Sequence, residues 1–322
     1  MNDKLKINGI RLNKNFIQLI REKISDTTDM SVPLYQTLAD NRINMVFALL
    51  NTMDKPFVSG TIAKNNFRQT LFPEDQSGSH SMISTVSTVS IYPHHYRLRL
   101  LGFLLSLLGQ QKLFFRHMVS SGSMLTFVVD QKNCDNFINI LSEEFDLPRS
   151  HVPFEQDENE ELTLFLKRKY PETRANYVEE KIKTYGIALV PDLILSYYTL
   201  SFDHLTEYGK KMRSMRYMTD KEDKFFYISA HMTASLQIQL FLLTGKSLDI
   251  PASKTCQADL LSFHGPHFGD RHHIINPALN CLKENLIPVL QVGCTGASIC
   301  IVVPHGNGLA AQQALMNMFE VP

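Results

Sequence analysis

Residues 286–303 read LIPVLQVGCTGASICIVV, and this stretch decides the fold of the chain. Residues 288–292 are mostly apolar and predict a strand, whereas residues 293–296 hold two glycines, which is typical of a turn. Residues 299–303 are mostly β-branched and predict a second strand. We therefore expect a tight β-hairpin here.

The residues on either side of this hairpin add one strand and two helices. Residues 259–263 predict a short strand, a loop follows, and a helix ends near Asn285; residues 309–319 predict a second helix. The order β-α-β-β-α is the split βαβ pattern, with its last strand missing or supplied from elsewhere. The predicted fold class is α+β, built from repeated ferredoxin-like (βαββαβ) modules.

The same pattern occurs twice, because residues 101–148 match residues 275–322 at a constant offset of 174. Each copy contains an apolar helical stripe at spacing i, i+3, i+4, i+7. The stripe residues are Leu101, Leu104, Leu105 and Leu108 in the first copy and Ile275, Ala278, Leu279 and Leu282 in the second. Residues 9–12 also resemble residues 186–189. The chain is therefore predicted to contain two homologous halves of about two modules each.

Weaker copies of the pattern lie over residues 31–72 and 190–245. Five of the seven residues 155–161 are acidic, which is typical of a solvated connection. The predicted domains are a divergent module at 1–80, a module at 81–148, an acidic and helical linker at 149–181, and modules at 182–254 and 255–322. The first strand of the first module is not evident, because residues 16–24 predict a helix.

Composition excludes several classes of protein. The 322 residues are 44% hydrophobic and carry 32 basic and 32 acidic side chains, so the formal charge is zero and nothing favours a nucleic-acid or membrane-surface partner. Five cysteines without a Cys-x-x-Cys pair argue against a disulfide framework. No secretory signal is visible, and the longest apolar run, residues 100–109, is too short to cross a bilayer. We expect a cytoplasmic protein.

The run from Leu279 to Gly293, followed by residues 296–303, resembles an ACT domain. It is most similar to the regulatory tandem ACT region of aspartate kinases, over residues 258–322 and less closely over 84–147. The resemblance implies a regulatory, amino-acid-binding fold whose units pair side by side and hold effectors between them. It does not imply kinase activity, because the sequence has no Lys-Phe-Gly-Gly stretch and no Gly-Gly pair.

The best candidate site is the loop at residues 264–271, which reads HGPHFGDR. Its glycines let backbone N–H groups converge at the start of the next helix, an arrangement that favours a carboxylate or phosphate. The ACT resemblance places effectors at this loop, which also carries a two-residue insertion. The predicted ligand-binding residues are Gly265, His267, Phe268, Gly269 and Asp270 in the loop, with Gln291 and Thr295 facing it from the strands. The alternative is a structural turn with Asp270 as helix N-cap.

Other motifs have simpler explanations. His264 and His267 have a zinc-like spacing, but no third ligand follows, so no metal is predicted. Cys294 and Cys300 flank a turn and are expected to pack in the core. Residues 306–311 fit Gly-x-Gly-x-x-Ala, yet only 11 residues follow, too few for a dinucleotide-binding unit. The equivalent loop at residues 92–96 has no glycine and is not expected to bind a ligand in this way.

The sequence therefore predicts a regulatory protein without a catalytic domain or cofactor, which senses an amino acid or small carboxylate at a module interface. The alternative is a structural adaptor that associates without a ligand; an enzyme is the weakest hypothesis, because no catalytic motif is visible. Apolar residues cover more than one face of the helix at residues 98–108. This predicts paired modules, and a homo-oligomer or protein partner.

Overall fold

The computed structural model describes residues 4–22, 34–54, 56–68, 70, 80–122, 124–148, 154–155, 181–215, 223–265, 274–296 and 298–321. The helices of this part are α1 (Leu34–Asp40), α2 (Leu98–Gln110), α3 (Cys134–Glu144), α5 (Leu205–Ser214), α6 (Ile275–Glu284) and α7 (Gly308–Met318), with 3-10 turns η1 (Lys64–Asn66), η3 (Gln131–Asn133) and η4 (Phe202–His204). The strands are β1 (Leu5–Lys6), β2 (Gly9–Glu22), β3 (Phe47–Asn51), β4 (Phe57–Ala63), β5 (His80–Tyr92), β6 (His117–Ser121), β7 (Met124–Asp130), β8 (Phe145–Asp146), β9 (Phe154–Glu155), β10 (Ile187–Ser201), β11 (Phe225–Met232), β12 (Gln237–Thr244), β13 (Lys254–His264), β14 (Gln291–Cys294) and β15 (Ser298–Pro304).

These elements form four repeated ferredoxin-like units, as the sequence predicts. The strand orders are β5-β2-β4-β3 in unit 1, β2-β5-β7-β6 in unit 2, β13-β10-β12-β11 in unit 3 and β10-β13-β15-β14 in unit 4. Units 1 and 2 form the first half and units 3 and 4 the second. Between units 2 and 4 the equivalent residues keep the offset of 174 from α2 and α6 onward, and β5 corresponds to β13 at an offset of 172.

Four long strands, β2, β5, β10 and β13, each serve two units. The pairing of β2 shifts register between Asn13 and Phe16, and that of β10 shifts between Val190 and Leu193. Beyond each shift the strand continues in the neighbouring unit. The expectation that the last strand of a unit is supplied from elsewhere is therefore confirmed for unit 4, where β10 supplies it.

The predicted helix at residues 16–24 is wrong, because Phe16 to Glu22 belong to β2 and pair with both β4 and β5. Ile17 and Leu19 pack beneath α1, whereas Phe16 belongs to a core on the other face of the sheet. A strand buried on both faces is apolar at successive positions, so its sequence does not alternate. Apolar residues three and four apart then imitate a helical stripe. Most of the predicted acidic and helical linker at residues 149–181 lies outside the described residues.

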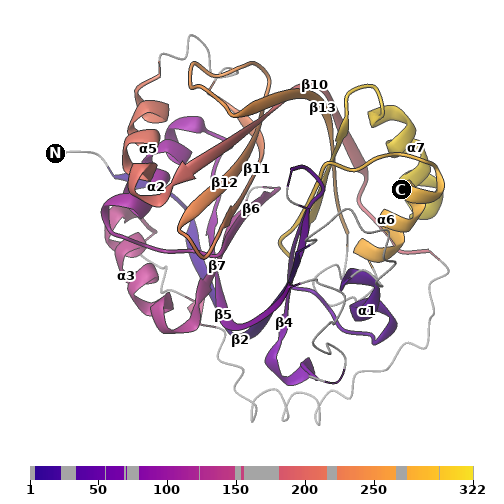
Figure 1. Cartoon of the computed structure of the whole chain (residues 1–322), viewed down its shortest axis with the longest axis horizontal. Helices are drawn as coiled ribbons and strands as arrows, with labels where there is room; N and C mark the ends of the chain where they lie inside the picture. Colours follow the sequence, from indigo (N-terminus) through magenta and orange to yellow (C-terminus); the bar gives the residue numbers. More distant parts are fainter. Residues whose placement is uncertain are drawn as a thin grey trace.

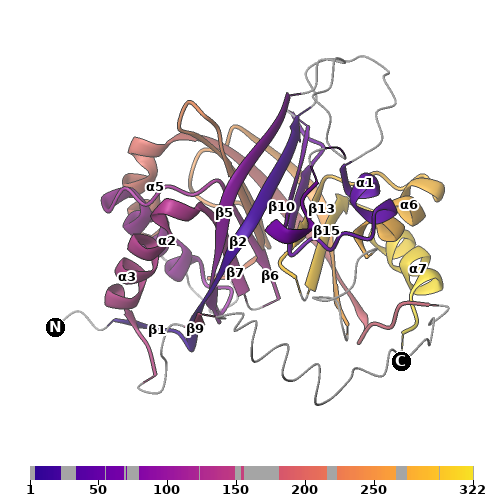
Figure 2. The same cartoon turned by 90° about the horizontal axis from the view of Figure 1, so that it is seen from below.

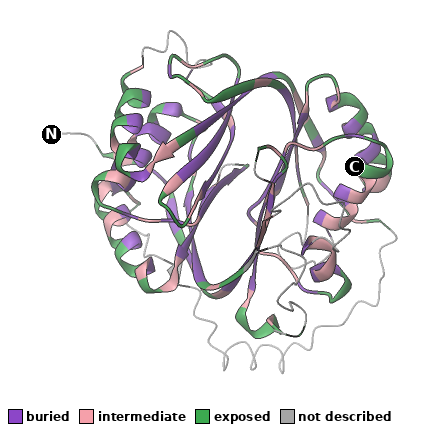
Figure 3. Cartoon of the chain, in the orientation of Figure 1, coloured by how far each residue is buried: buried purple, intermediate pink, exposed green. Residues whose placement is uncertain are grey.

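The strands close into a ring. Within the described residues the order is β4-β3-β14-β15-β13-β10-β12-β11-β6-β7-β5-β2-β9, and an additional pairing of β4 with β2 completes the circle. Figure 1 shows the ring as two sheets face to face, with α2, α3 and α5 outside one sheet and α1, α6 and α7 outside the other. The view from below separates the same two helical layers (Figure 2). The strands are mostly buried, and the outer helical surfaces are exposed (Figure 3).

Two pairings join the halves. The first joint is β6 with β11, where His117 lies opposite His231. The second joint is β14 with β3, where Gln291 lies opposite Asn51. Because β6 and β14 are equivalent strands, the two joints are equivalent positions of the repeat.

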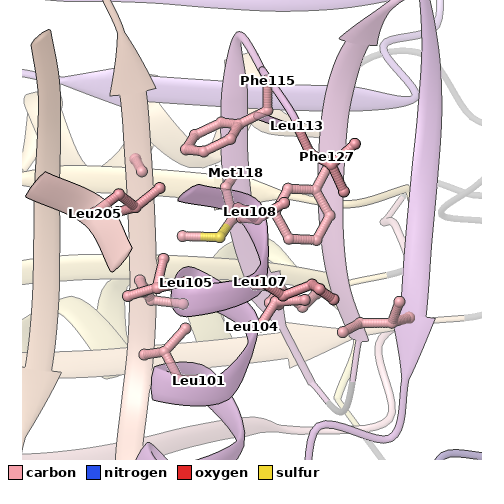
Figure 4. Packing of buried hydrophobic residues seen from close by; sticks show 14 of the residues in the cluster. Leu101, Leu104, Leu105, Leu107, Leu108, Leu113, Phe115, Met118, Phe127 and Leu205 are labelled. Atoms are coloured by element: carbon pink, nitrogen blue, oxygen red, sulfur yellow. The ribbon is translucent and has the colours of Figure 1, made fainter. Parts of the chain in front are cut away.

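The helical layer over the first joint is tightly packed. The predicted stripe of α2, Leu101, Leu104, Leu105 and Leu108, is buried with Phe115, Met118 and Phe127 of its own unit and Leu205 of α5 (Figure 4). Burial of each leucine contributes about 2 kcal/mol. Glycines bring the helix backbones together, because a Cβ on Gly209 would lie 2.4 Å from the amide nitrogen of Ser106. The covering module that the sequence predicts for α2 is thus unit 3.

Candidate ligand-binding site

The predicted ligand loop connects β13 to α6. Its first residues are described: His264 is exposed and its ring lies 5.3 Å from that of Tyr185, and Gly265 is half-buried. The predicted loop residues His267, Phe268, Gly269 and Asp270 fall within residues 266–273, outside the described part of the chain. The structure therefore places the two ends of the loop, at His264 and at Ile274 before α6.

Gln291 and Thr295 are both buried between the two sheets. Val292 and Cys294 pack against the residues of α6, so the alternating positions Gln291 and Thr295 face the other side of the sheet. Gln291 donates from Nε2 to Oδ1 of Asn51 at 2.6 Å and accepts from the hydroxyl of Ser229 at 3.0 Å. Their predicted position facing the loop stays a prediction, since the loop itself is not described.

Thr295 forms a side-chain hydrogen bond with Ser121, its equivalent residue in the first half. The two joints therefore touch at equivalent residues. Gly293 allows this approach, because an added Cβ would lie 2.6 Å from Val119 and 2.8 Å from the ring of Tyr227 in the opposite sheet. Gln291 and Thr295 thus connect unit 4 to the first joint.

The equivalent helix start, at α2, is occupied by a carboxylate of the chain itself. The backbone N–H of Arg99 donates to Oδ1 of Asp223 at 3.1 Å, and the N–H of Leu98 donates to the Asp223 carbonyl at 3.3 Å. The Arg99 guanidinium lies 3.8 Å from Oδ2. Asp223 lies two residues before β11 of unit 3, so one unit supplies an anion to the helix N-terminus of its neighbour. Sequence reasoning missed this residue.

At the second joint a neutral residue stands at the position of that carboxylate. Strand β11 carries one extra residue at a bulge between Phe225 and Tyr227, so the residue equivalent to Asp223 is Asn44. No side chain caps the start of α6 within the described residues, where the N-cap is Ile274. The start of α6 therefore has no counterpart of the Asp223 carboxylate among the residues that the structure describes. A comparison of unit 1 with unit 3 in the sequence was the one signal that could have indicated this difference.

The loop between β5 and α2 is filled by aromatic side chains. The ring of His94 lies 4.6 Å from Tyr96 and 5.0 Å from Phe225, and its Nδ1 accepts the Tyr96 backbone N–H at 2.9 Å. Burial, followed by the charge of His95, lowers the pKa of His94 to about 4. His94 is therefore neutral near pH 7 and supplies no positive charge for an anionic ligand.

The cysteines do not form a reactive site in the described chain. All five are free, and Cys294 and Cys300 are buried, as the sequence predicts for core residues. Burial raises the pKa of Cys294 to about 11 and that of Cys300 to about 12, so both thiols stay protonated near pH 7. A protonated thiol is a poor nucleophile.

Comparison with known proteins identifies the fold. No protein-family model matches the chain, and no curated protein sequence matches it. The crystal structure of aspartate kinase from Synechocystis is similar, with a TM-score of 0.72 and 12% sequence identity over 99% of this chain and 57% of that one. The ligand-free regulatory subunit of aspartate kinase from Thermus thermophilus matches 44% of this chain and 99% of its own, with 13% identity and a TM-score of 0.37.

The chain thus has the fold of part of an aspartate kinase and spans 57% of the length of that enzyme. This is the fold that the sequence resemblance implies. Among the described residues, no helix is long and apolar enough to cross a membrane.

Proposed function

We propose that this chain is a regulatory protein that binds an amino acid or a small carboxylate at the loop between β13 and α6. Gly265, His267, Phe268, Gly269 and Asp270 would contact the ligand, and Gln291 and Thr295 would couple the occupied unit to the opposite sheet. In this proposal the chain has no catalytic activity of its own. A cytoplasmic location suits a sensor of free amino acids.

The observation that carries the proposal is the difference between the starts of α2 and α6. At α2, Asp223 from the neighbouring unit places a carboxylate on the backbone N–H of Arg99. At the second joint the equivalent residue is Asn44, which is neutral, so that position offers no negative charge to the N-terminus of α6. A ligand carboxylate would supply at the second joint what the protein supplies at the first.

A thermal-shift screen of the twenty protein amino acids tests the proposal, because a ligand that binds only the folded state raises Tm by mass action. We expect at least one amino acid to raise Tm of the wild type. Gly269→Val should abolish that shift. Glu284→Gln, at the exposed far end of α6, is the matched control and should keep it. A screen without any stabilising ligand, or a shift that survives Gly269→Val, would refute the site.

The second candidate function is a structural adaptor that associates without a ligand. The occupied start of α2 favours it, since at that joint the chain completes its own site with Asp223. Gel filtration and pull-down experiments with and without the twenty amino acids separate the two functions. A partner or oligomer that forms equally in both conditions, together with no thermal shift, supports the adaptor.

A further inference from the structure

One cluster of metal-ligating side chains lies apart from the loop. Within the part of the chain that the structure describes, Asp192, Asp259 and His305 form a group whose donor atoms all lie within 4.8 Å of one another. Asp192 is at the bulge of β10, Asp259 is in β13, and His305 begins the turn between β15 and α7. The group therefore joins three segments of the second half.

The distance from the imidazole to each carboxyl group matches that between two ligands of one ion. Nδ1 of His305 lies 3.4 Å from Oδ1 of Asp192 and 3.5 Å from Oδ1 of Asp259. Two donors bound tetrahedrally at about 2.0–2.2 Å from a single zinc ion are about 3.3–3.6 Å apart. Ordinary N–H···O hydrogen bonds are shorter, at about 2.9–3.0 Å. The imidazole nitrogen thus stands almost equally far from both carboxylates, at the distance that a shared cation would impose.

The backbone holds the central ligand in place. The Asp259 side chain is 4% exposed, its Oδ2 accepts the N–H groups of Gly306 and Gly308 at 2.9 Å each, and its Oδ1 accepts that of Asp192 at 3.2 Å. Gly308 is required for this approach, because an added Cβ would lie 2.8 Å from Oδ2 of Asp259. The Asp192 and His305 side chains are 76% and 47% exposed, which leaves water access to the remaining coordination positions.

The first half of the chain shows that this charged set is not needed for the fold. The equivalent residues there are Asn15, Ser87 and Gln131, which are all neutral. The bulge has the same left-handed backbone in both halves, with φ of 66° at Asn15 and 59° at Asp192. The strand pairing is also equivalent, since Ser87 lies opposite Val129 and Asp259 opposite Val303. In the first half the bulge, the strand and the turn form with neutral side chains at these three positions. The fold therefore does not require the two carboxyl groups and the imidazole of the second half.

We propose that Asp192, Asp259 and His305 bind a divalent transition-metal ion of the zinc class. Two carboxyl groups and an imidazole offer the mixed oxygen and nitrogen ligands that suit such an ion. The bound ion ties the β10 bulge, where units 3 and 4 meet, to the start of α7. This inference is independent of the proposed amino-acid site.

Isothermal titration calorimetry of the full chain with ZnCl₂ at pH 7.5, after treatment with a chelator, tests the site. The variant Asp192→Asn/His305→Gln installs the residues of the first half at two exposed positions, so it should fold with an unchanged circular dichroism spectrum. We expect the wild type to bind Zn²⁺ at least about 10-fold more tightly than this variant.

His204→Gln is the matched control, because His204 is an exposed histidine beside Asp203 on a different turn. It should bind Zn²⁺ as the wild type does. Titration with MgCl₂ examines the carboxylates alone and should give weaker binding that does not depend on His305. The proposal is overturned if the double variant keeps the wild-type affinity, or if His204→Gln weakens binding as much as the double variant does.

Discussion

The first and second joints have the same strand pairing but different chemistry at their centres. At the first joint the rings of His117 and His231 stack with centroids 4.7 Å apart, beside Phe47 and Phe57. At the second joint the equivalent residues, Gln291 and Asn51, form a 2.6 Å hydrogen bond. Neither ring nitrogen of His117 has a hydrogen-bond partner among the described residues. The same strand pairing is therefore compatible with an amide hydrogen bond, which does not depend on pH, and with a pair of titratable rings.

The helical layers over the two joints also differ, and the layer over the first joint is the more closely packed. Over the first joint, Gly102 and Gly109 of α2 contact the backbone of α5. The equivalent positions of α6 are Asn276, half-buried, and Lys283, exposed. The first joint is thus closed by backbone contact, by the Asp223 carboxylate and by stacked rings. Under the proposed function the second joint is the one that responds to a ligand, and the variants below test the parts of this contrast.

The largest effect is expected at the helix contact. Gly109→Leu should lower the free energy of unfolding by about 3 kcal/mol, because a Cβ there would lie 2.7 Å from the amide nitrogen of Thr206. Lys283→Leu places the same side chain at the equivalent, exposed position of α6 and should change stability by less than about 0.5 kcal/mol. Urea unfolding of both variants measures the difference. Equal losses would show that the two layers are packed alike.

The histidine pair should make stability depend on pH. Burial lowers the pKa of His231 to about 4 and that of His117 well below its usual value. Charge on the other histidine and on Arg116 further lowers that of His117. Between pH 6.5 and 4 the unfolded chain binds protons that the folded chain does not, so stability is complete above pH 6.5 and is lost as the pH falls. From pH 6.5 to 5.5 each histidine should cost about 1 kcal/mol.

The swap variant His117→Gln/His231→Asn installs the pair of the second joint and isolates this effect. Its unfolding free energy should fall by about 2 kcal/mol less than that of the wild type over the same pH step. His94 is present in both proteins and its pKa is also lowered to about 4, so the swap variant should keep a smaller dependence of stability on pH. Glu22, whose Oε1 lies 3.8 Å from Nε2 of His231, is the nearest acidic group to include as a single variant. An unchanged slope in the swap variant would mean that the pair does not titrate as buried neutral rings.

A smaller effect is expected at the start of α2. Asp223→Ala removes the carboxylate that accepts the Arg99 N–H and should cost about 1 kcal/mol. Asn44→Ala, at the equivalent position of the second joint, removes no charge, so its cost should not change with salt. Thermal unfolding at low and high salt measures both. If Asp223→Ala costs nothing, the first joint is not completed by that carboxylate.

The repeated fold could be predicted because units 2 and 4 preserve the same apolar stripe, the same glycine turn and the same strands at one offset. Units 1 and 3 preserve less, and the strand at Phe16 was hidden because both of its faces are buried. The ring closure depends on the pairing of β2 with β4. No local sequence pattern predicts this pairing, because the two strands are far apart in the chain.

Of the candidate site, the helix that follows the loop could be predicted, since its apolar stripe is a local signal; the ligand-binding role of the loop stays a prediction. The hydrogen bonds of Gln291 to Asn51 and Ser229 could not, because they join residues that are far apart in the chain. Asp223 was missed for the same reason: its partner, Arg99, lies 124 positions away. Recognition of such pairs requires the tertiary pairing of units.

The ring closes within a single chain, and this has a consequence for how its two halves can change. Two identical chains that assembled in this way would carry every substitution twice, and their association would depend on protein concentration. Here both joints form intramolecularly, at an effective concentration set by the chain itself. A substitution at His117 is therefore not mirrored at Gln291, and dilution does not separate the halves. Covalent linkage therefore lets the two equivalent joints hold different residues.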